Sequence, residues 1–341
     1  MQPVAKSRSK WEYMTMNKAK SDYGPLFGKI RQEKNLSLTD LEEEGLSRSF
    51  IGKFEKGETK ISADRFFRLL SKIQVTPDEF LSRQYGGQTP DYFSRLADRI
   101  ENNDGKAGHI QTNLQLEKEI SQDYAADPSN LAAKYLGIML HYMNEIAILV
   151  RDNRMADYYR VRAAFEKASD EILNYLFNVE IWGKFEIYLY SSFSMAFSPE
   201  TRMLLLKSAL KSSDYLRDIA NDGDFAFEDY KILLTVMSNQ IYDDLTSMKK
   251  TLEMFNERLQ ERPDIRFKAE YLFELGLYEI ATGNQARGEA RANNVIKVLT
   301  LLADEGEAKV LAYFLQRFKT YLKKKEAGKD KPDDRTMRLW L

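Results

Sequence analysis

Apolar residues follow the period of an α-helix along most of this chain, and almost no segment alternates polar and apolar residues as a strand does. In residues 23–83 the apolar positions form five short patterns, and from about residue 92 onward they form longer patterns separated by breaks. These breaks include Asp127-Pro128, Ser198-Pro199, Asn221-Asp222-Gly223, Arg262-Pro263 and Gly283-Asn284. The sequence therefore predicts an all-α protein.

The segment from residue 36 to 57 predicts two short helices joined by a tight turn. Ser37 and Asp40 have the spacing of a capping box that begins the first helix. Ser47 suits the N-cap of the second helix, and Gly57 ends it. The apolar residues that share one side of the second helix, and should face the core, are Phe50, Ile51 and Phe54. This arrangement is how helix-turn-helix proteins place a helix in the DNA major groove.

The outward side of that second helix carries short and basic side chains, which suit base edges and phosphates. A glycine there, Gly52, lowers the stability of the helix by about 1 kcal/mol relative to alanine, so its presence fits the close approach of another surface. The candidate DNA contacts are Arg48, Ser49, Gly52, Lys53, Lys56 and, in the following loop, Lys60.

The neighbouring segments complete the first domain and indicate its limits. Ser62 and Thr76-Pro77 have the residue types of two further helix starts. The Gly and Pro residues of QYGGQTP indicate a linker. The expected organisation is a disordered leader (1–22), a five-helix DNA-binding domain (23–83), a linker (84–90), a helical repeat domain (91–325) and a tail (326–341). The leader could instead be a DNA-contacting arm, and Met14 or Met16 could be the functional start.

The string SRSFIGKFEKG, the EGLS turn, the ISADRFF helix and the DEFL ending carry a family resemblance. They resemble the Xre class of helix-turn-helix proteins, in its Rgg/GadR/MutR branch. The resemblance implies that Arg31 and Glu55 form a structural ion pair. Many relatives carry Gln where this chain has Leu38, so the phosphate contact at that point would fall to backbone amides at the helix N-terminus.

The C-terminal three-quarters of the chain predict stacked helical hairpins. Residues 267–299 resemble a degenerate tetratricopeptide repeat, with a turn at Gly283-Asn284 and small residues, Ala286 and Ala290, that would let the second helix pack closely. The pattern predicts an α-solenoid, with an irregular helical bundle as the alternative.

Such a solenoid has a concave groove suited to an extended peptide. The Rgg resemblance implies a short hydrophobic signalling peptide as the ligand, as in quorum sensing. Amide and guanidinium groups can bind a peptide backbone and a carboxylate. The candidate peptide contacts are Arg151, Asn153, Arg154, Tyr190 and Asn239. For each of them, the alternative is a solvated or interhelical polar residue.

The distribution of charge supports DNA binding by the first domain. Residues 1–85 hold 16 Lys and Arg against 12 Asp and Glu, a balance of +4, whereas the remaining residues hold 35 against 40, a balance of −5. The surplus is modest, so we expect a homodimer that covers two half-sites of promoter DNA. Peptide binding would then change DNA affinity or the recruitment of RNA polymerase. We expect the last helices, residues 307–325, to contribute to the dimer contact.

Catalysis has little support, because the chain has no Cys and only two histidines, His109 and His141. We expect no enzyme activity, no cofactor, no metal and no membrane span, and a cytoplasmic location. Two alternatives remain open. The helix-turn-helix could dock a protein, or the regulator could respond to a small molecule or to no ligand.

Overall fold

The structure is a computed structural model that describes residues 22–86, 92–101, 109–152, 154–219 and 227–328. The chain divides into two compact units, Met1–Arg99 and Ile100–Leu341. The described residues are helical apart from turns, loops and an isolated bridge between Glu43 and Leu46. None of the helices in these ranges has the length and apolar character needed to cross a membrane.

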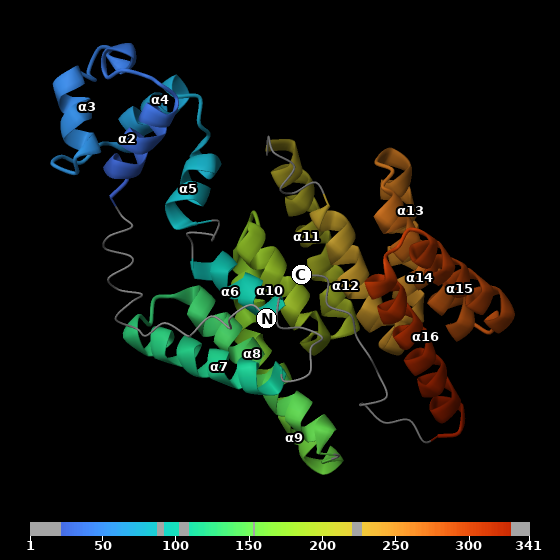
Figure 1. The fold of residues 1–341 in the computed structure, drawn as a ribbon. Helices are drawn as coiled ribbons and strands as arrows, with labels where there is room; N and C mark the ends of the chain where they lie inside the picture. The colour runs from blue at the N-terminus through green and yellow to red at the C-terminus, as the bar shows by residue number, and fades with distance from the viewer. Residues whose placement is uncertain (1–21, 87–91, 102–108, 153, 220–226, 329–341) are drawn as a thin grey trace, which may run out of the picture. The chain divides into compact units, whose positions relative to one another are not determined.

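The first unit contains the five helical segments expected of a helix-turn-helix domain, followed by α6 (Figure 1). The segments are α2 (Gly24–Glu33), η1 (Thr39–Leu41), α3 (Arg48–Glu55), α4 (Ala63–Lys72), α5 (Pro77–Tyr85) and α6 (Tyr92–Glu101).

Capping residues set the starts of these helices. The Ser47 hydroxyl accepts a hydrogen bond from Phe50 N at 3.2 Å, and the Thr76 hydroxyl accepts one from Glu79 N at 3.1 Å. Ser37 and Asp40 also form their reciprocal hydrogen bonds. The helix they begin is nevertheless only a three-residue 3-10 turn, because the chain is already extended at Glu42. The short helix predicted to begin after Ser37 is thus a single 3-10 turn and not an α-helix.

Aromatic side chains form the centre of the first unit. The Phe66 ring lies 5.3 Å from Tyr23 and 5.0 Å from Phe80, measured between ring centroids. Helix α2 approaches α3 so closely that a Cβ on Gly24 would overlap the carbonyl oxygen of Phe54. This close approach ties the position of α3 to the core.

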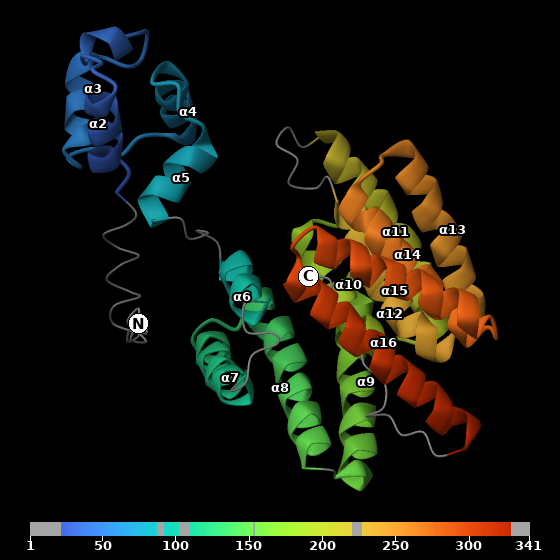
Figure 2. The ribbon, with the colours of Figure 1, turned by 45° about the vertical axis from the view of Figure 1, so that its right-hand side comes forward.

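The second unit is a succession of antiparallel helices (Figures 1 and 2). They are α7 (His109–Ala126), α8 (Leu131–Arg151), α9 (Met155–Asn178), α10 (Lys184–Phe193), η2 (Ser194–Ala196), α11 (Pro199–Ile219), α12 (Glu228–Asp243), α13 (Leu245–Glu261), α14 (Ile265–Ala281), α15 (Gln285–Leu301) and α16 (Glu305–Glu326).

Most of these helices contact the next one along the chain, and several also contact the second one along. Thus α14 packs on α13, α15, α12 and α16, and α10 packs on α8 and α12. Figure 2 shows α14, α15 and α16 side by side. Contacts between neighbours along the chain are the mark of a helical solenoid, as the spacing of apolar residues predicted.

A close crossing in the second unit joins α14 to α15. Glycines face each other there: a Cβ on Gly276 would lie 2.9 Å from the Gly288 oxygen, and a Cβ on Gly288 would overlap the Gly276 oxygen. Ala286 and Ala290, which the sequence indicated as the small contact residues, are exposed. The prediction was wrong by about half a helical turn, and the contact is made by Gly288 and the buried Ala292.

Charged side chains cross-link α11, α12 and α13 in the same unit. The Arg258 guanidinium donates to both Asp214 oxygens at 2.7 and 2.9 Å and to Asp229 at 2.7 Å. Arg217 also pairs with Asp214, at 2.8 Å. Asp229 is completely buried, so these guanidinium groups supply its counter-charge.

Candidate nucleic-acid interface

Helix α3 has one side in the core and one side on the surface of its unit. Ile51 and Phe54 are 0% and 3% exposed and pack among the other buried side chains of the domain. Because the apolar side is buried, the remaining side must face outward.

The structure places the candidate DNA contacts on that outward side. Exposed side chains are those of Arg48, Ser49, Lys53, Lys56 and Lys60. Gly52 is half-buried, and a Cβ there would lie 3.6 Å from Leu38 Cδ1, an ordinary contact distance. The packing of the domain therefore does not require a glycine at position 52.

Ion pairs and hydrogen bonds of the side chains separate two groups of cations in residues 22–86. In one group, outside residues 48–65, the cations pair with a carboxylate or, for Lys34, donate to the Gln74 carbonyl: Lys29, Arg31, Lys34, Arg68, Lys72 and Arg83. In the other group the side-chain cation has neither an ion pair nor a hydrogen bond among the described residues: Arg48, Lys53, Lys56, Lys60 and Arg65. The second group lies entirely on α3, on the loop after it and at the start of α4. This surface can therefore bind an anion without breaking an existing pair.

A bidentate ion pair holds the end of α3. Arg31 Nε lies 2.6 Å from Glu55 Oε1, and Arg31 Nη2 lies 2.8 Å from Glu55 Oε2. Arg31 also donates to the carbonyl oxygen of Leu36. The hydrogen bonds to Glu55 outweigh burial and raise the pKa of Arg31. Both residues are committed to the fold, so neither is free to contact DNA.

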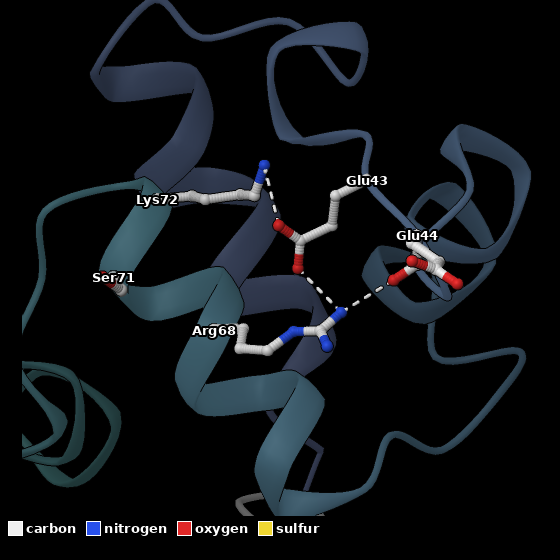
Figure 3. Close-up of a pocket in the computed structure, with 5 residues that line it drawn as sticks. All are labelled: Glu43, Glu44, Arg68, Ser71 and Lys72. Atoms are coloured by element: carbon white, nitrogen blue, oxygen red, sulfur yellow. Dashed lines mark hydrogen bonds and ion pairs between the residues drawn. The ribbon is translucent and has the colours of Figure 1, made fainter.

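A second ion-pair cluster supports the turn before α3 (Figure 3). Glu43 accepts from Arg68 at 2.7 Å and from Lys72 at 3.1 Å, and Arg68 also donates to the Glu44 carbonyl at 2.9 Å. The hydrogen bond from Lys72 is the main reason that the pKa of Glu43 is lowered. These residues line a shallow pocket of about 420 Å³. Its cations are already neutralised, which makes it a poor anion site.

Sequence patterns alone did not single out Arg65 as a candidate. Its guanidinium carbon lies 5.4 Å from the centroid of the Phe50 ring, and one of its nitrogens would lie 3.9 Å from a Cβ on Gly45. Phe50 thus holds a cation of α4 beside the turn that precedes α3. The spacing of residues in α4 could not show that Arg65 is exposed and unpaired, because this depends on how α3 lies against α4.

The residues considered for ligand binding in the second unit fall into two groups. Arg151 and Arg154 are exposed at the turn between α8 and α9, where they pair with Asp152 and Asp157 at 2.8 and 2.5 Å. Asn153 lies outside the described residues.

The other two candidates are in the core. Tyr190 is 0% exposed and donates from its hydroxyl to the Arg202 carbonyl at 2.8 Å. Asn239 is 3% exposed and donates to Ser194 Oγ and to the Thr235 carbonyl. In this conformation their hydrogen bonds stabilise helix packing rather than a groove.

Comparison with known proteins adds a decisive observation about the second unit. The family described as HTH-type transcriptional regulator Rgg, C-terminal domain, matches residues 116–314, which is more than half of the chain. The chain belongs to the Rgg family of transcriptional regulators. The helix-turn-helix family matches residues 28–80 of this Rgg-family chain, which contain η1, α3 and α4.

Solved structures share the fold of this Rgg-family protein along most of its length. A Listeria monocytogenes EGD-e protein assigned as a transcriptional regulator superposes with a TM-score of 0.71 at 20% identity, covering 89% of this chain and 98% of its own. The Streptococcus dysgalactiae SHP pheromone receptor Rgg2 gives 0.62 at 22% identity, covering 87% and 99%. The PrgX/cCF10 complex gives 0.60 at 16% identity, covering 91% and 94%.

Proposed function

We propose that this Rgg-family regulator binds promoter DNA through the outward side of α3. Arg48 and Ser49, in the first turn of the helix, would contact base edges, and Lys53, Lys56, Lys60 and Arg65 would contact phosphates. The observation that carries this proposal is the grouping of unpaired cations on one surface, while the other cations of residues 22–86 have partners.

The structure of α3 also supports the assignment of base contacts to some of its residues and phosphate contacts to others. Residues near the N-terminus of a recognition helix reach base edges, and an Arg can form two hydrogen bonds to guanine. Gly52 lies one turn further along the same helix and presents no side chain, so DNA backbone can approach there.

Fluorescence anisotropy with a duplex selected from a random pool by the unaltered chain tests this proposal. Arg48→Ala should lose about 1–3 kcal/mol of discrimination at one base pair. Lys53→Ala and Arg65→Ala should weaken binding to all duplexes and lower the salt slope by about 1 each. Lys29→Ala is the matched control, because it removes an exposed cation of the same unit that pairs with Glu33.

The alternative, in which α3 docks a protein, makes the opposite prediction. The Arg48→Ala, Lys53→Ala double variant would then bind the selected duplex as tightly as the unaltered chain. Circular dichroism of each variant should remain helical, which separates loss of contact from loss of fold.

We further propose that a short hydrophobic peptide bound by residues 100–341 controls DNA binding. Support comes from two proteins with this fold whose structures are described as a pheromone receptor and as a PrgX/cCF10 complex. In this chain, Arg151 and Arg154 are the proposed contacts for a peptide carboxylate. Arg151 pairs with the exposed Asp152 and Arg154 with the half-buried Asp157, and each arginine could exchange its partner for a ligand at little cost. The bound peptide would change DNA affinity or contact with RNA polymerase.

Titration of the full chain with a panel of synthetic hydrophobic peptides tests peptide control. Saturable binding in the micromolar range or tighter is expected for at least one peptide, with weaker binding by an Arg151→Ala, Arg154→Ala variant. Arg160→Ala is the control, because Arg160 is 77% exposed and shares Asp157 as a partner. A response to a small molecule instead, or to no ligand, would contradict peptide control and leave the DNA proposal intact.

A further inference from the structure

Positive charge is unevenly divided between residues 1–21 and the helix-turn-helix domain that follows them. Residues 22–86 hold 11 Lys and Arg against 11 Asp and Glu, so their formal charges cancel. Residues 1–21 contain the single acid Glu12 and five cations: Lys6, Arg8, Lys10, Lys18 and Lys20. Attraction to DNA phosphates depends on a positive surplus, and the whole surplus of residues 1–86 therefore lies before residue 22.

The structure fixes the point at which residues 1–21 join the domain. The start of α2 lies against the end of α3, where a Cβ on Gly24 would overlap the carbonyl oxygen of Phe54. A Cβ on Gly57, two positions after α3, would overlap a carboxylate oxygen of Asp22. The other oxygen of Asp22 accepts a hydrogen bond from Gly24 N at 3.3 Å. Asp22 is thus held beside the end of α3.

Aromatic packing holds the same point against α4 and α5. Tyr23 lies directly before α2, and its ring centroid is 5.3 Å from that of Phe66 and 5.6 Å from that of Phe80. Phe66 and Phe80 are themselves buried in the core of the domain. Because residues 22 and 23 are fixed by these contacts, the preceding chain must leave the domain beside the end of α3.

Two of the proposed phosphate contacts lie next to this point. Lys56 directly precedes Gly57, and Lys60 follows it by three positions. Both side chains are exposed and have neither an ion pair nor a hydrogen bond within the described ranges. Lys20 is only two positions before Asp22, which limits their separation to about 7 Å along the chain. A duplex that touches Lys56 and Lys60 would therefore be within reach of the cations before residue 22.

We propose that residues 1–21 form an arm that leaves the domain beside the end of α3 and follows the phosphates of the bound duplex. The cations of the arm occur at alternate positions, at 6, 8 and 10 and again at 18 and 20. Alternate residues of an extended chain share one side, so each group can face a DNA strand together. The proposal rests on the DNA binding proposed above and adds to it a contact that is independent of base sequence.

The salt dependence of DNA affinity tests the arm. Anisotropy with the selected duplex compares the unaltered chain with an arm variant that removes the net charge of residues 1–21: Lys6→Gln, Lys10→Gln, Lys18→Gln, Lys20→Gln. The slope of log affinity against log salt should become shallower by about 3, at about 0.9 for each lost phosphate contact. The arm variant should keep the preference of the unaltered chain for the selected duplex over a scrambled one, because phosphate contacts carry no sequence information.

The matched control removes four positive charges from the other end of the chain: Lys329→Gln, Lys331→Gln, Arg335→Gln, Arg338→Gln. This tail variant should have the salt slope of the unaltered chain. An equal fall in both variants would mean that net charge alone sets the slope, and it would overturn the proposal.

Trp11 reports the contact directly, since it follows Lys10 in the arm. In a Trp340→Phe chain the other tryptophan, Trp182, is 0% exposed, so acrylamide should quench mainly Trp11. The selected duplex should reduce this quenching in the Trp340→Phe chain and leave it unchanged when the four lysines of the arm are also replaced. Quenching that the duplex does not reduce in either chain would contradict an arm on DNA.

Failure of the arm can be distinguished from failure of DNA binding by α3. If only the arm proposal is wrong, the arm variant has the salt slope of the unaltered chain, while Arg48→Ala still loses discrimination at one base pair. If α3 does not bind DNA, no sequence is enriched from the random pool, and both proposals are overturned.

Discussion

The guanidinium of Arg31 forks the carboxylate of Glu55, with 2.6 Å from Nε to Oε1 and 2.8 Å from Nη2 to Oε2. This pair joins α2 to the last residue of α3, and both side chains are nearly buried, at 9% and 11% exposure. The surface proposed to bind DNA thus depends on a contact on the other side of α3.

Removing one member of this pair should therefore be costly. Arg31→Ala is expected to destabilise α2 and α3 by about 3–5 kcal/mol, because it leaves the Glu55 carboxylate buried without a counter-charge. Hydrogen exchange of peptides from these two helices, followed by mass spectrometry, measures the change. In the control Arg83→Ala, which breaks the exposed pair with Glu33, the change should stay below about 1 kcal/mol. Equal effects of the two substitutions would contradict the structural role of Arg31.

Substitution of Gly52 should separate stability from DNA binding. Gly52→Ala should stabilise α3 by about 1 kcal/mol, since alanine is the better helix former and its Cβ would meet only Leu38 Cδ1 at 3.6 Å. DNA affinity should nevertheless fall, because the methyl group would enter the space that DNA backbone occupies. Hydrogen exchange and anisotropy on the same variant give the two quantities. A stabilised variant with unchanged DNA affinity would show that DNA does not approach this residue.

The glycine contact between α14 and α15 should be intolerant of any side chain. Gly288→Ala is expected to destabilise the second unit by about 1–3 kcal/mol, because the added Cβ would overlap the Gly276 oxygen. Urea unfolding can be followed by the fluorescence of the buried Trp182 in a chain carrying Trp11→Phe and Trp340→Phe. Gly306→Ala, in the first turn of α16, is the control and should be neutral or stabilising, since its nearest contact would be 3.9 Å away.

Asp214 should make the stability of the second unit depend on pH. Burial raises the pKa of this carboxyl, but hydrogen bonds from Arg258 and Arg217 outweigh burial, so that the pKa lies below its ordinary value of 3.8. A lowered pKa in the folded state contributes stability that is present above pH 3.8 and is lost as the pH falls through the folded value.

The matching experiment compares Asp214→Asn with the unaltered chain by urea unfolding between pH 6 and pH 3. The variant should be less stable at pH 6, and the difference should shrink as the pH falls below about 4. Asp218→Asn is the control, because Asp218 is 74% exposed and lies 3.8 Å from Arg217. A difference that stayed constant across this range would show that the charge of Asp214 does not stabilise the unit.

Local residue order was enough to predict the helices, the caps at Ser47 and Thr76, and the outward side of α3. Each of these depends on residues within one or two turns of helix, where spacing decides which side chains share a side. The pairing of Arg31 with Glu55 was expected from family resemblance, since 24 positions separate the two residues.

Tertiary packing decided what spacing could not. Ser37 and Asp40 formed the predicted capping box, but the chain turned away at Glu42 after a single 3-10 turn. Gly288, and not Ala286 or Ala290, became the close contact because helix rotation is set by the partner helix. Three other features likewise depend on which helices lie against each other. They are the burial of Tyr190 and Asn239, the position of Arg65 beside Phe50, and the exposure of Leu301 and Leu302. Such contacts join residues far apart in the chain, and no local pattern specifies them.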